Sequence, residues 1–261
     1  MKPSIIKNLI KYWDNISNIN SYKIFSHKIQ GDSDHTWFWQ SVERGEWEPE
    51  TFEVFDKFVK SGDYVCDLGG WIGPTVLYAA AKGASVSAFE PDPEAFKYLK
   101  ENVALNRFKK VSCYNSAIST IDGVKKMAPF FQALGDSTSS LLDGRRESND
   151  SADVECLTWD SACLKYKLPK YNFMKIDIEG SEFDLIPQME SYLRRDKPVV
   201  YLSTHAPYLP QEEREDKLKK IADVIDSWAN LETSSGIPLD IKEIYSSNSQ
   251  DKFCSFIIRP S

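Results

Sequence analysis

The stretch that most constrains the fold is Tyr64–Gly73, with the sequence YVCDLGGWIG. Its apolar start predicts a buried strand that ends at Leu68, and Thr75–Ala81 after the glycines predicts a helix. A strand, a tight glycine turn and a helix together begin a nucleotide-binding βαβ unit, in which glycine lets a ligand approach the backbone. The stretch therefore predicts an α/β fold with a mostly parallel sheet.

The spacing within this turn separates two classes of ligand. Asp67, Gly69 and Gly73 form the pattern Asp-x-Gly-x-x-x-Gly, whereas dinucleotide sites have Gly-x-Gly-x-x-Gly. A dinucleotide site places a pyrophosphate at a helix N-terminus, where negative charge is favoured. An aspartate before the first glycine repels a phosphate and attracts an ammonium or a sulfonium. The turn therefore favours S-adenosylmethionine (SAM), which carries both cations.

Length and charge exclude other classes. At 261 residues and 41% hydrophobic, the chain can bury one substantial core. The net charge is −7, and basic pairs such as Lys109-Lys110 and Lys125-Lys126 are typical of a solvated face. We therefore expect no nucleic-acid partner. The sequence has no run of 18 apolar residues, so we expect no integral membrane segment.

The cysteines and the N-terminus indicate the compartment. The five cysteines contain no Cys-x-x-Cys pair, which is typical of reduced thiols. The first residues alternate lysines with isoleucines and lack a continuous apolar segment, so they predict a short amphipathic helix instead of a signal peptide. We therefore expect a cytoplasmic protein.

Two parts of the chain are expected. Residues 1–60 are predicted to be a helical, aromatic extension that serves as a lid over substrate or cofactor, and residues 61–261 the SAM-binding domain. Trp37, Trp39 and Trp47 lie in the extension. They can pack it onto the domain or wall a ligand cleft, and the sequence leaves both roles open.

The next strands supply candidate cofactor contacts. Ser85–Phe89 predicts a second strand that ends at Glu90, about twenty residues after the turn, where an acidic side chain can bind both ribose hydroxyls. Pro91 follows and begins a Pro-Asp-Pro helix start. Val111–Ile118 predicts a third strand, and Ser116 and Ala117 at its end are where the adenine edge is met in a SAM site. Residues 124–131 and 154–157 then predict an inserted β-hairpin.

Phe173–Gly180 predicts a further buried strand with charges at alternate positions. Lys175, Asp177 and Glu179 share one side if the strand persists. Buried charges are costly unless they are paired or functional. Asp177 is expected near the transferred methyl group, because the carboxyl ends of parallel strands border the ligand crevice. A structural Lys175–Asp177 ion pair is the alternative, and both can be true.

The fifth predicted strand, 198–204, brings His205 to the same edge, opposite Asp177. A lone histidine is usually structural, but its position directly after a buried strand favours a functional role. Two final strands, 241–245 and 253–258, are predicted to pair antiparallel with each other.

Five segments together resemble the FkbM-type methyltransferases: 67–73, 88–93, 115–118, 137–141 and the most specific, Lys175–Glu182 (KIDIEGSE). The resemblance spans roughly residues 45–210. It implies a class I methyltransferase with a Rossmann-like fold, whose seven-stranded, mostly parallel sheet has an antiparallel last strand. It also implies SAM-dependent O-methylation of a hydroxyl on a sugar, a glycan or a related small molecule. The expected cofactor-binding residues are Asp67, Gly69, Gly70, Gly73, Glu90, Pro91, Ser116, Ala117 and Asp177. The pair Gly70-Trp71 departs from the family pattern, in which alanine followed by a small or polar residue is more usual.

The expected catalytic residues are Asp177, His205 and Lys175. A methyl transferase must align the acceptor oxygen and remove its proton. We expect His205 to be the base and Asp177 to orient the acceptor or the imidazole. Alternatively, Asp177, His205 and a third oxygen ligand hold Mg²⁺ or Mn²⁺, which acidifies the hydroxyl. Two ligands do not establish a site, so the metal stays open.

The sequence disfavours three other classes of protein. An NAD(P)- or nucleotide-sugar-binding oxidoreductase on a similar fold is disfavoured by the spacing of the glycine turn. A non-catalytic SAM-binding module is disfavoured by the buried Asp177 and the position of His205. A nucleic-acid 2′-O-methyltransferase is disfavoured by the acidic charge. The sequence specifies neither the acceptor and its hydroxyl nor the oligomeric state.

Overall fold

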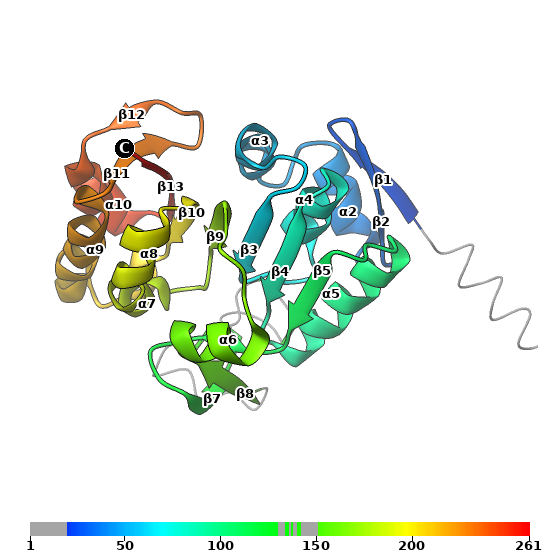
Figure 1. The fold of residues 1–261 in the computed structure, drawn as a ribbon, viewed down its shortest axis with the longest axis horizontal. Coiled ribbons are helices and arrows are strands. Elements are labelled where there is room, and N and C mark those ends of the chain that lie inside the picture. The colour runs from blue at the N-terminus through cyan, green and yellow to red at the C-terminus, as the bar shows by residue number, and fades with distance from the viewer. Residues whose placement is uncertain (1–19, 130–133, 136, 138–139, 142–150) are drawn as a thin grey trace, which may run out of the picture.

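The computed structural model describes residues 20–129, 134–135, 137, 140–141 and 151–261. Its middle layer is an eight-stranded sheet, ordered β12-β11-β13-β10-β9-β3-β4-β5 (Figure 1). The strands in that order are Pro238–Leu239, Ala229–Thr233, Cys254–Pro260, Val199–Thr204, Phe173–Ile176, Tyr64–Leu68, Ser85–Phe89 and Val111–Tyr114. The neighbouring strands β10, β9, β3, β4 and β5 run parallel to one another. β13 lies between β10 and β11 and is antiparallel to both. The predicted mostly parallel sheet with an antiparallel last strand is confirmed, and the two-residue β12 is an addition at its edge.

Helices cover both faces of this sheet. One core contains residues of α6, α7, α8 and α9, and the other contains residues of α2, α3, α4 and α5. Alternate residues of one strand enter opposite cores: Val200 and Leu202 pack on the first, and Tyr201 packs on the second. The helices are α2 (Thr36–Glu43), α3 (Pro49–Phe58), α4 (Pro74–Ala81), α5 (Pro93–Leu105), α6 (Trp159–Tyr166), α7 (Glu182–Gln188), α8 (Glu190–Asp196), α9 (Gln211–Asp226) and α10 (Ser247–Asp251), with the 3₁₀ helices η1 (Ala206–Tyr208) and η2 (Ile241–Tyr245).

A second, three-stranded sheet lies at the edge of the molecule with α6 (Figure 1). β7 (Gly123–Met127) pairs antiparallel with β8 (Ala152–Leu157), which confirms the predicted hairpin where the structure describes it. β6 (Ala117–Ile118) pairs parallel with β8. The third predicted strand is therefore divided. It ends as β5 at Tyr114, and its last two residues belong to the small sheet.

The prediction for the last pair of strands was wrong in one member. Ile241–Tyr245 is the 3₁₀ helix η2, because the Asp240 side chain accepts a hydrogen bond from the Lys242 backbone N–H and caps it. Ile244 is buried in the core next to α9. The partner of β13 is β11 instead, a strand in which only Leu231 carries a large apolar side chain. Such a short polar segment lacks the pattern of a buried strand.

The described part of the N-terminal region contains strand as well as helix. β1 (Asn20–Ile24) and β2 (His27–Gly31) form an antiparallel hairpin ahead of α2 and α3. Trp39 is completely buried, whereas Trp37 is largely exposed. The predicted amphipathic helix in residues 1–19 lies outside the described residues.

A buried carboxylate ties this region to α5. The two carboxylate oxygens of Asp32 contact His35 Nδ1 at 2.7 Å, Trp39 Nε1 at 3.1 Å and Asn102 Nδ2 at 3.0 Å. Burial alone would raise the pKa of Asp32, but hydrogen bonds from His35, Asn102 and Trp39 outweigh it and lower the pKa to about 2.

We therefore expect the stability contributed by Asp32 to depend on pH. A carboxyl group with a lowered pKa in the folded state stabilises the protein above its ordinary pKa, and this contribution is lost as the pH falls from about 4 towards about 2. Asp32→Asn should lower the free energy of unfolding by about 2 kcal/mol at pH 7. Urea unfolding of the wild-type protein and of Asp32→Asn at pH 7, 5 and 3 measures the difference between their free energies of unfolding, which should be smaller at pH 3. A difference independent of pH would contradict the assignment.

Two further expectations concern the whole chain. Within the described residues, none of the helices combines the length and the apolar character needed to cross a membrane. All five cysteines are free thiols, as predicted.

Candidate active site

A cavity of about 420 Å³ lies at the carboxyl ends of β3, β4, β9 and β10. The crevice at this edge is where open α/β sheets bind their ligands. Its lining includes these expected site residues: Gly69, Gly70, Glu90, Pro91, Ser116, Ala117, Lys175, Asp177 and His205. Asp67 and Gly73 are absent from the lining, so nine of the eleven expected site residues meet at one cavity.

The glycine turn forms one end of the cavity. The backbone N–H groups of Gly69 and Gly70 both donate to the carbonyl oxygen of Phe89, at 3.0 and 3.1 Å. Gly69 has φ +85°, and a Cβ on it would overlap the carbonyl oxygen of Asp177. Glycine is therefore required there to let β3 and the end of β9 come together.

Glu90 lies at the same end, directly after β4. Its Oε2 accepts from the Trp71 backbone N–H at 2.7 Å, and its Oε1 accepts from that of Asp92 at 2.8 Å. Burial raises the pKa of Glu90 to about 8, although the two backbone N–H groups oppose the shift. Each carboxylate oxygen has a second lone pair, so Glu90 can still accept hydrogen bonds from a ligand.

Asp67 lies beneath the cavity and acts within a buried network. Thr75 Oγ1 donates to its Oδ2 at 2.5 Å, and Lys175 Nζ lies 3.3 Å from its Oδ1. The same Lys175 amine donates to the Gly69 carbonyl at 2.8 Å and lies 3.3 Å from Asp177 Oδ2. Burial alone would lower the pKa of Lys175, but Asp177 and Asp67 outweigh it and raise the pKa. The anticipated Lys175–Asp177 ion pair is thus present, and Lys175 joins the glycine turn to Asp177.

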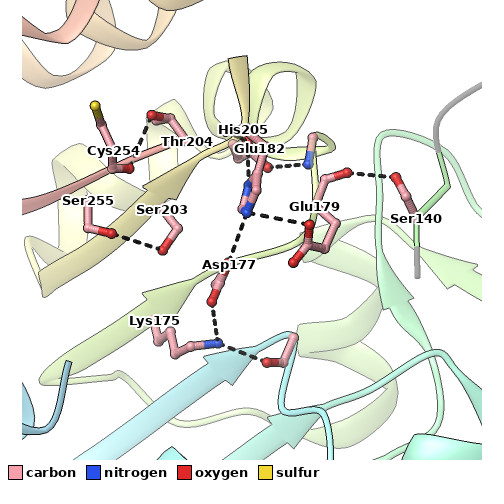
Figure 2. A network of polar contacts seen from close by, with 12 residues as sticks. Ser140, Lys175, Asp177, Glu179, Glu182, Ser203, Thr204, His205, Cys254 and Ser255 are labelled. Carbon is pink, nitrogen blue, oxygen red and sulfur yellow. Dashed lines mark hydrogen bonds and ion pairs between the residues drawn. The ribbon is translucent and has the colours of Figure 1, made fainter. Parts of the chain in front are cut away.

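His205, Asp177 and Glu179 line the other end of the cavity, and the buried Glu182 contacts the imidazole from behind (Figure 2). His205 Nε2 lies 3.5 Å from both Asp177 Oδ1 and Glu179 Oε2. On the other side of the ring, Nδ1 lies 3.2 Å from Glu182 Oε1, which also accepts the His205 backbone N–H at 2.7 Å. We call Asp177, Glu179, Glu182 and His205 the carboxylate–imidazole cluster.

The charges in this cluster stabilise one another. Burial alone would lower the pKa of His205, but the carboxylates of Glu182, Asp177 and Glu179 outweigh it and raise the pKa to about 9. Burial would likewise raise the pKa of Asp177, but Lys175 and His205 lower it. For Glu179, burial prevails over His205 and raises the pKa to about 7. These carboxylates therefore favour a positive charge among them, which the protonated imidazole of His205 supplies.

A strained turn after β9 builds the cluster. The strand ends at Ile176, four residues before the predicted end at Gly180, and Glu179 and Gly180 have φ values of +52° and +98°. Glu182 Oε2 accepts the Gly180 backbone N–H at 2.9 Å, and Ser140 Oγ donates to the Glu179 carbonyl at 2.6 Å. A positive φ at a residue with a side chain costs free energy, so the surrounding contacts must hold this turn.

Glu179 and Glu182 are site residues that the sequence analysis did not select. Both belong to KIDIEGSE, but a persistent strand gives no reason for Glu182 to approach His205. The available signal was the Glu-Gly pair, because glycine at the end of a buried strand often marks a sharp turn.

Aromatic rings from the N-terminal region border the cavity. Trp47 lines it, and its ring packs 5.0 Å from that of Phe38 and 6.3 Å from that of Trp71. Trp71 adopts φ +46° and donates from Nε1 to the Gly135 carbonyl at 2.9 Å. Trp47 and Trp71 are therefore both packing residues and cavity walls, whereas Trp39 is packing alone.

The family model described as Methyltransferase FkbM domain matches residues 67–230, more than half of the chain. This chain belongs to the FkbM methyltransferase family. The match includes the glycine turn, Glu90 and the whole carboxylate–imidazole cluster. The resemblance found in the sequence is confirmed.

Individual relatives differ in the acceptor that their names state. The hexuronic acid methyltransferase AglP of Haloferax volcanii is 24% identical over 165 residues, covering 63% of this chain and 65% of that protein. The tRNA (guanine(37)-N(1))-methyltransferase of Phytophthora infestans is 43% identical over 86 residues, covering 33% of this chain and 20% of that protein. This chain spans 11–20% of the length of four such tRNA methyltransferases. The solved structure of methyltransferase FkbM from Methylobacillus flagellatus matches with a TM-score of 0.47 and 14% identity, over 97% of this chain and 60% of that one. The predicted absence of a nucleic-acid partner has no support from these relatives.

The cavity residues fit SAM better than a dinucleotide. Among the described lining residues, the carboxylates are Glu48, Glu50, Glu90, Asp177 and Glu179, and Lys175 is the one lysine or arginine. Its amine already contacts Asp67, Asp177 and the Gly69 carbonyl. A negatively charged wall attracts a sulfonium and an ammonium and repels a pyrophosphate.

Proposed function

We propose that this FkbM-family protein is a SAM-dependent O-methyltransferase acting on a hydroxyl group of a sugar, a glycan or a related small molecule. The observation that carries the proposal is that Glu90 and three members of the carboxylate–imidazole cluster, Asp177, Glu179 and His205, line one cavity. Glu90 supplies the cofactor end, and the cluster supplies groups that can bind and deprotonate a hydroxyl.

We assign cofactor binding to the glycine-turn end. Gly69, Gly70 and the small residues Ser116 and Ala117 leave room beside Glu90. Glu90 would accept the ribose hydroxyls there. When bound, SAM supplies a methyl group activated by a positively charged sulfur. Asp67 and Gly73 act indirectly, since Asp67 holds Lys175 and Gly73 begins α4 with φ +103°.

At the other end, Asp177 and His205 would orient the acceptor hydroxyl and receive its proton. Glu182 holds the imidazole, so the ring keeps its orientation while the acceptor binds. Lys175 keeps Asp177 at a fixed distance from the glycine turn, which aligns the two ends of the cavity.

The acceptor class rests on the cavity wall and on one relative. Trp47, Tyr201, Tyr208 and Phe253 line the cavity and provide flat apolar surface for a ring. AglP matches over 63% of this chain, whereas the tRNA methyltransferase of Phytophthora infestans matches over 33% of it. RNA is therefore the second acceptor class to test. Residues up to 60 contribute Trp47, Glu48 and Glu50 to the wall, which supports their role as a lid.

Calorimetric titration with SAM, S-adenosylhomocysteine and NAD tests the cofactor. We expect the first two to bind, and Glu90→Ala to weaken their affinity by about 10- to 100-fold, because it removes the hydrogen bonds to both ribose hydroxyls. The control is Glu94→Ala, an exposed carboxylate in the first turn of α5. Binding of NAD alone would overturn the proposal in favour of redox chemistry.

Transfer of a radiolabelled methyl group tests the acceptor. The panel contains neutral sugars, a hexuronic acid, their glycosides and tRNA. We expect a carbohydrate hydroxyl to be labelled. Labelling of tRNA alone would replace the proposed acceptor class while leaving SAM as the cofactor.

A further inference from the structure

We propose that the carboxylate–imidazole cluster is a divalent-cation site, with Asp177, Glu179 and His205 as ligands and Glu182 as the residue that orients the histidine. Binding of the cation depends on these side chains alone. Only what the cation does for the acceptor rests on the proposed methyl transfer.

The ligand atoms of Asp177, Glu179 and His205 lie close enough together to share one cation. One ligand atom from each of Asp177, Glu179 and His205 lies within 4.8 Å of the other two. His205 Nε2 is 3.5 Å from each of the two carboxylate oxygens. Ligands about 2.1 Å from a cation in octahedral geometry are roughly 3 Å apart when adjacent. A small inward movement of the two carboxylates therefore completes three coordination positions.

Glu182 determines which ring nitrogen of His205 is available to a cation. Oε1 of the fully buried Glu182 accepts the His205 backbone N–H and faces Nδ1 at 3.2 Å, so Nδ1 carries the hydrogen. A metal-binding imidazole is neutral, and its Nε2 is then an acceptor that points at two other acceptors (Figure 2). A divalent cation between these three acceptors would satisfy them all and would replace the proton that Nε2 otherwise carries. A carboxylate behind the ligating histidine is the usual support in metal sites.

The three ligands are largely buried but remain accessible from the cavity. The His205 side chain is 10% exposed, while those of Asp177 and Glu179 are 22% and 17% exposed, and all three line the cavity. Three protein ligands on one side leave the cavity side for water and an acceptor hydroxyl. Two carboxylates and one imidazole suit Mn²⁺ and similar divalent ions. A cation there would polarise the acceptor hydroxyl, so His205 would act as a ligand in place of a base.

The backbone conformation after β9 also supports a cation site. Glu179 is held in a left-handed conformation with φ +52°. The Glu182 carboxylate accepts a hydrogen bond from the backbone N–H of Gly180, the residue after Glu179. Glu182 thus fixes both a ligand-bearing turn and the ligating histidine. This strain brings Glu179 to the imidazole, whereas continuation of β9 would carry it away.

Direct binding of Mn²⁺ to the whole chain tests the proposal. After treatment with a chelator and its removal, free Mn²⁺ is measured by electron paramagnetic resonance at pH 7.5 without SAM. We expect one ion per chain. Asp177→Asn and Glu179→Gln should each weaken the affinity at least tenfold, and Glu182→Gln by about 10- to 100-fold. The matched control is Asp184→Asn, an exposed carboxylate on α7 that pairs with Lys217 and should leave the affinity unchanged.

The outcomes separate this inference from the proposed function. Circular dichroism melting confirms that each variant is folded. Absence of stoichiometric Mn²⁺ binding, or equal binding by the control and the ligand variants, overturns the cation site. If methyl transfer then persists in chelator, O-methylation stands with His205 as the base. If Mn²⁺ binds as expected but SAM does not, the cation site stands and the proposed function falls.

Discussion

Replacement of His205 by alanine lowers kcat for methyl transfer by about 100- to 10,000-fold, the range for loss of a group that handles a proton. The substitution removes the imidazole between Asp177 and Glu179, so the loss is expected whether His205 is a base or a cation ligand. Transfer of labelled methyl to the acceptor found in the screen measures it. SAM affinity should change little, since Glu90 and the glycine turn lie at the other end of the cavity.

The control for this experiment is His27→Ala. His27 packs edge-on against the Tyr78 ring at 5.6 Å and does not line the cavity. Its loss should leave kcat within about twofold, because surface-side packing does not affect proton transfer. If His205→Ala keeps most of its turnover while it remains folded, both roles assigned to His205 are wrong.

The second large effect is expected at Gly69. Gly69→Ala places a Cβ against the Asp177 carbonyl oxygen at a residue with φ +85°. The contact is with backbone at the junction of β3 and β9, so no flexible side chain can move aside. We expect the free energy of unfolding to fall by more than about 4 kcal/mol, the range reached by clashes and strain in a core.

Gly62→Ala separates the clash from the backbone conformation. Gly62 has φ +91°, and a Cβ there meets nothing within 4 Å. Gly62→Ala should lower the free energy of unfolding by only about 1–2 kcal/mol, which is the cost of placing a residue with a side chain in the left-handed conformation. Urea unfolding of both variants gives the difference. Equal destabilisation would mean that the turn relaxes and that the close approach of β3 and β9 is not required.

The glycine turn explains how far local sequence can predict this fold. Apolar runs that end in glycine or in a charge locate β3, β4 and β10 correctly, because a buried parallel strand must be apolar until it reaches the ligand edge. The same logic places Glu90 and His205 at the cavity. It fails for β11, whose side chains alternate weakly, and for η2, whose capping aspartate competes with a strand.

Asp67 shows the limit for site residues. Its spacing before the glycines favours a site for a cationic ligand, but its side chain contacts Thr75 and Lys175 beneath the cavity. Whether a strand-end carboxylate reaches a ligand depends on which neighbouring strand supplies a partner, and Lys175 is 108 residues away in the chain.

The sequence by itself determined the α/β class, the ligand edge of the sheet and the candidates Glu90, Asp177 and His205, because each follows from the end of a strand. Only the tertiary structure decided that Glu179 and Glu182 join His205. That meeting requires β9 and β10 to be neighbours and β9 to stop at Ile176 in a left-handed turn. Periodicity records which face of an element is buried, whereas contacts between distant carboxylates and an imidazole are set by packing and charge.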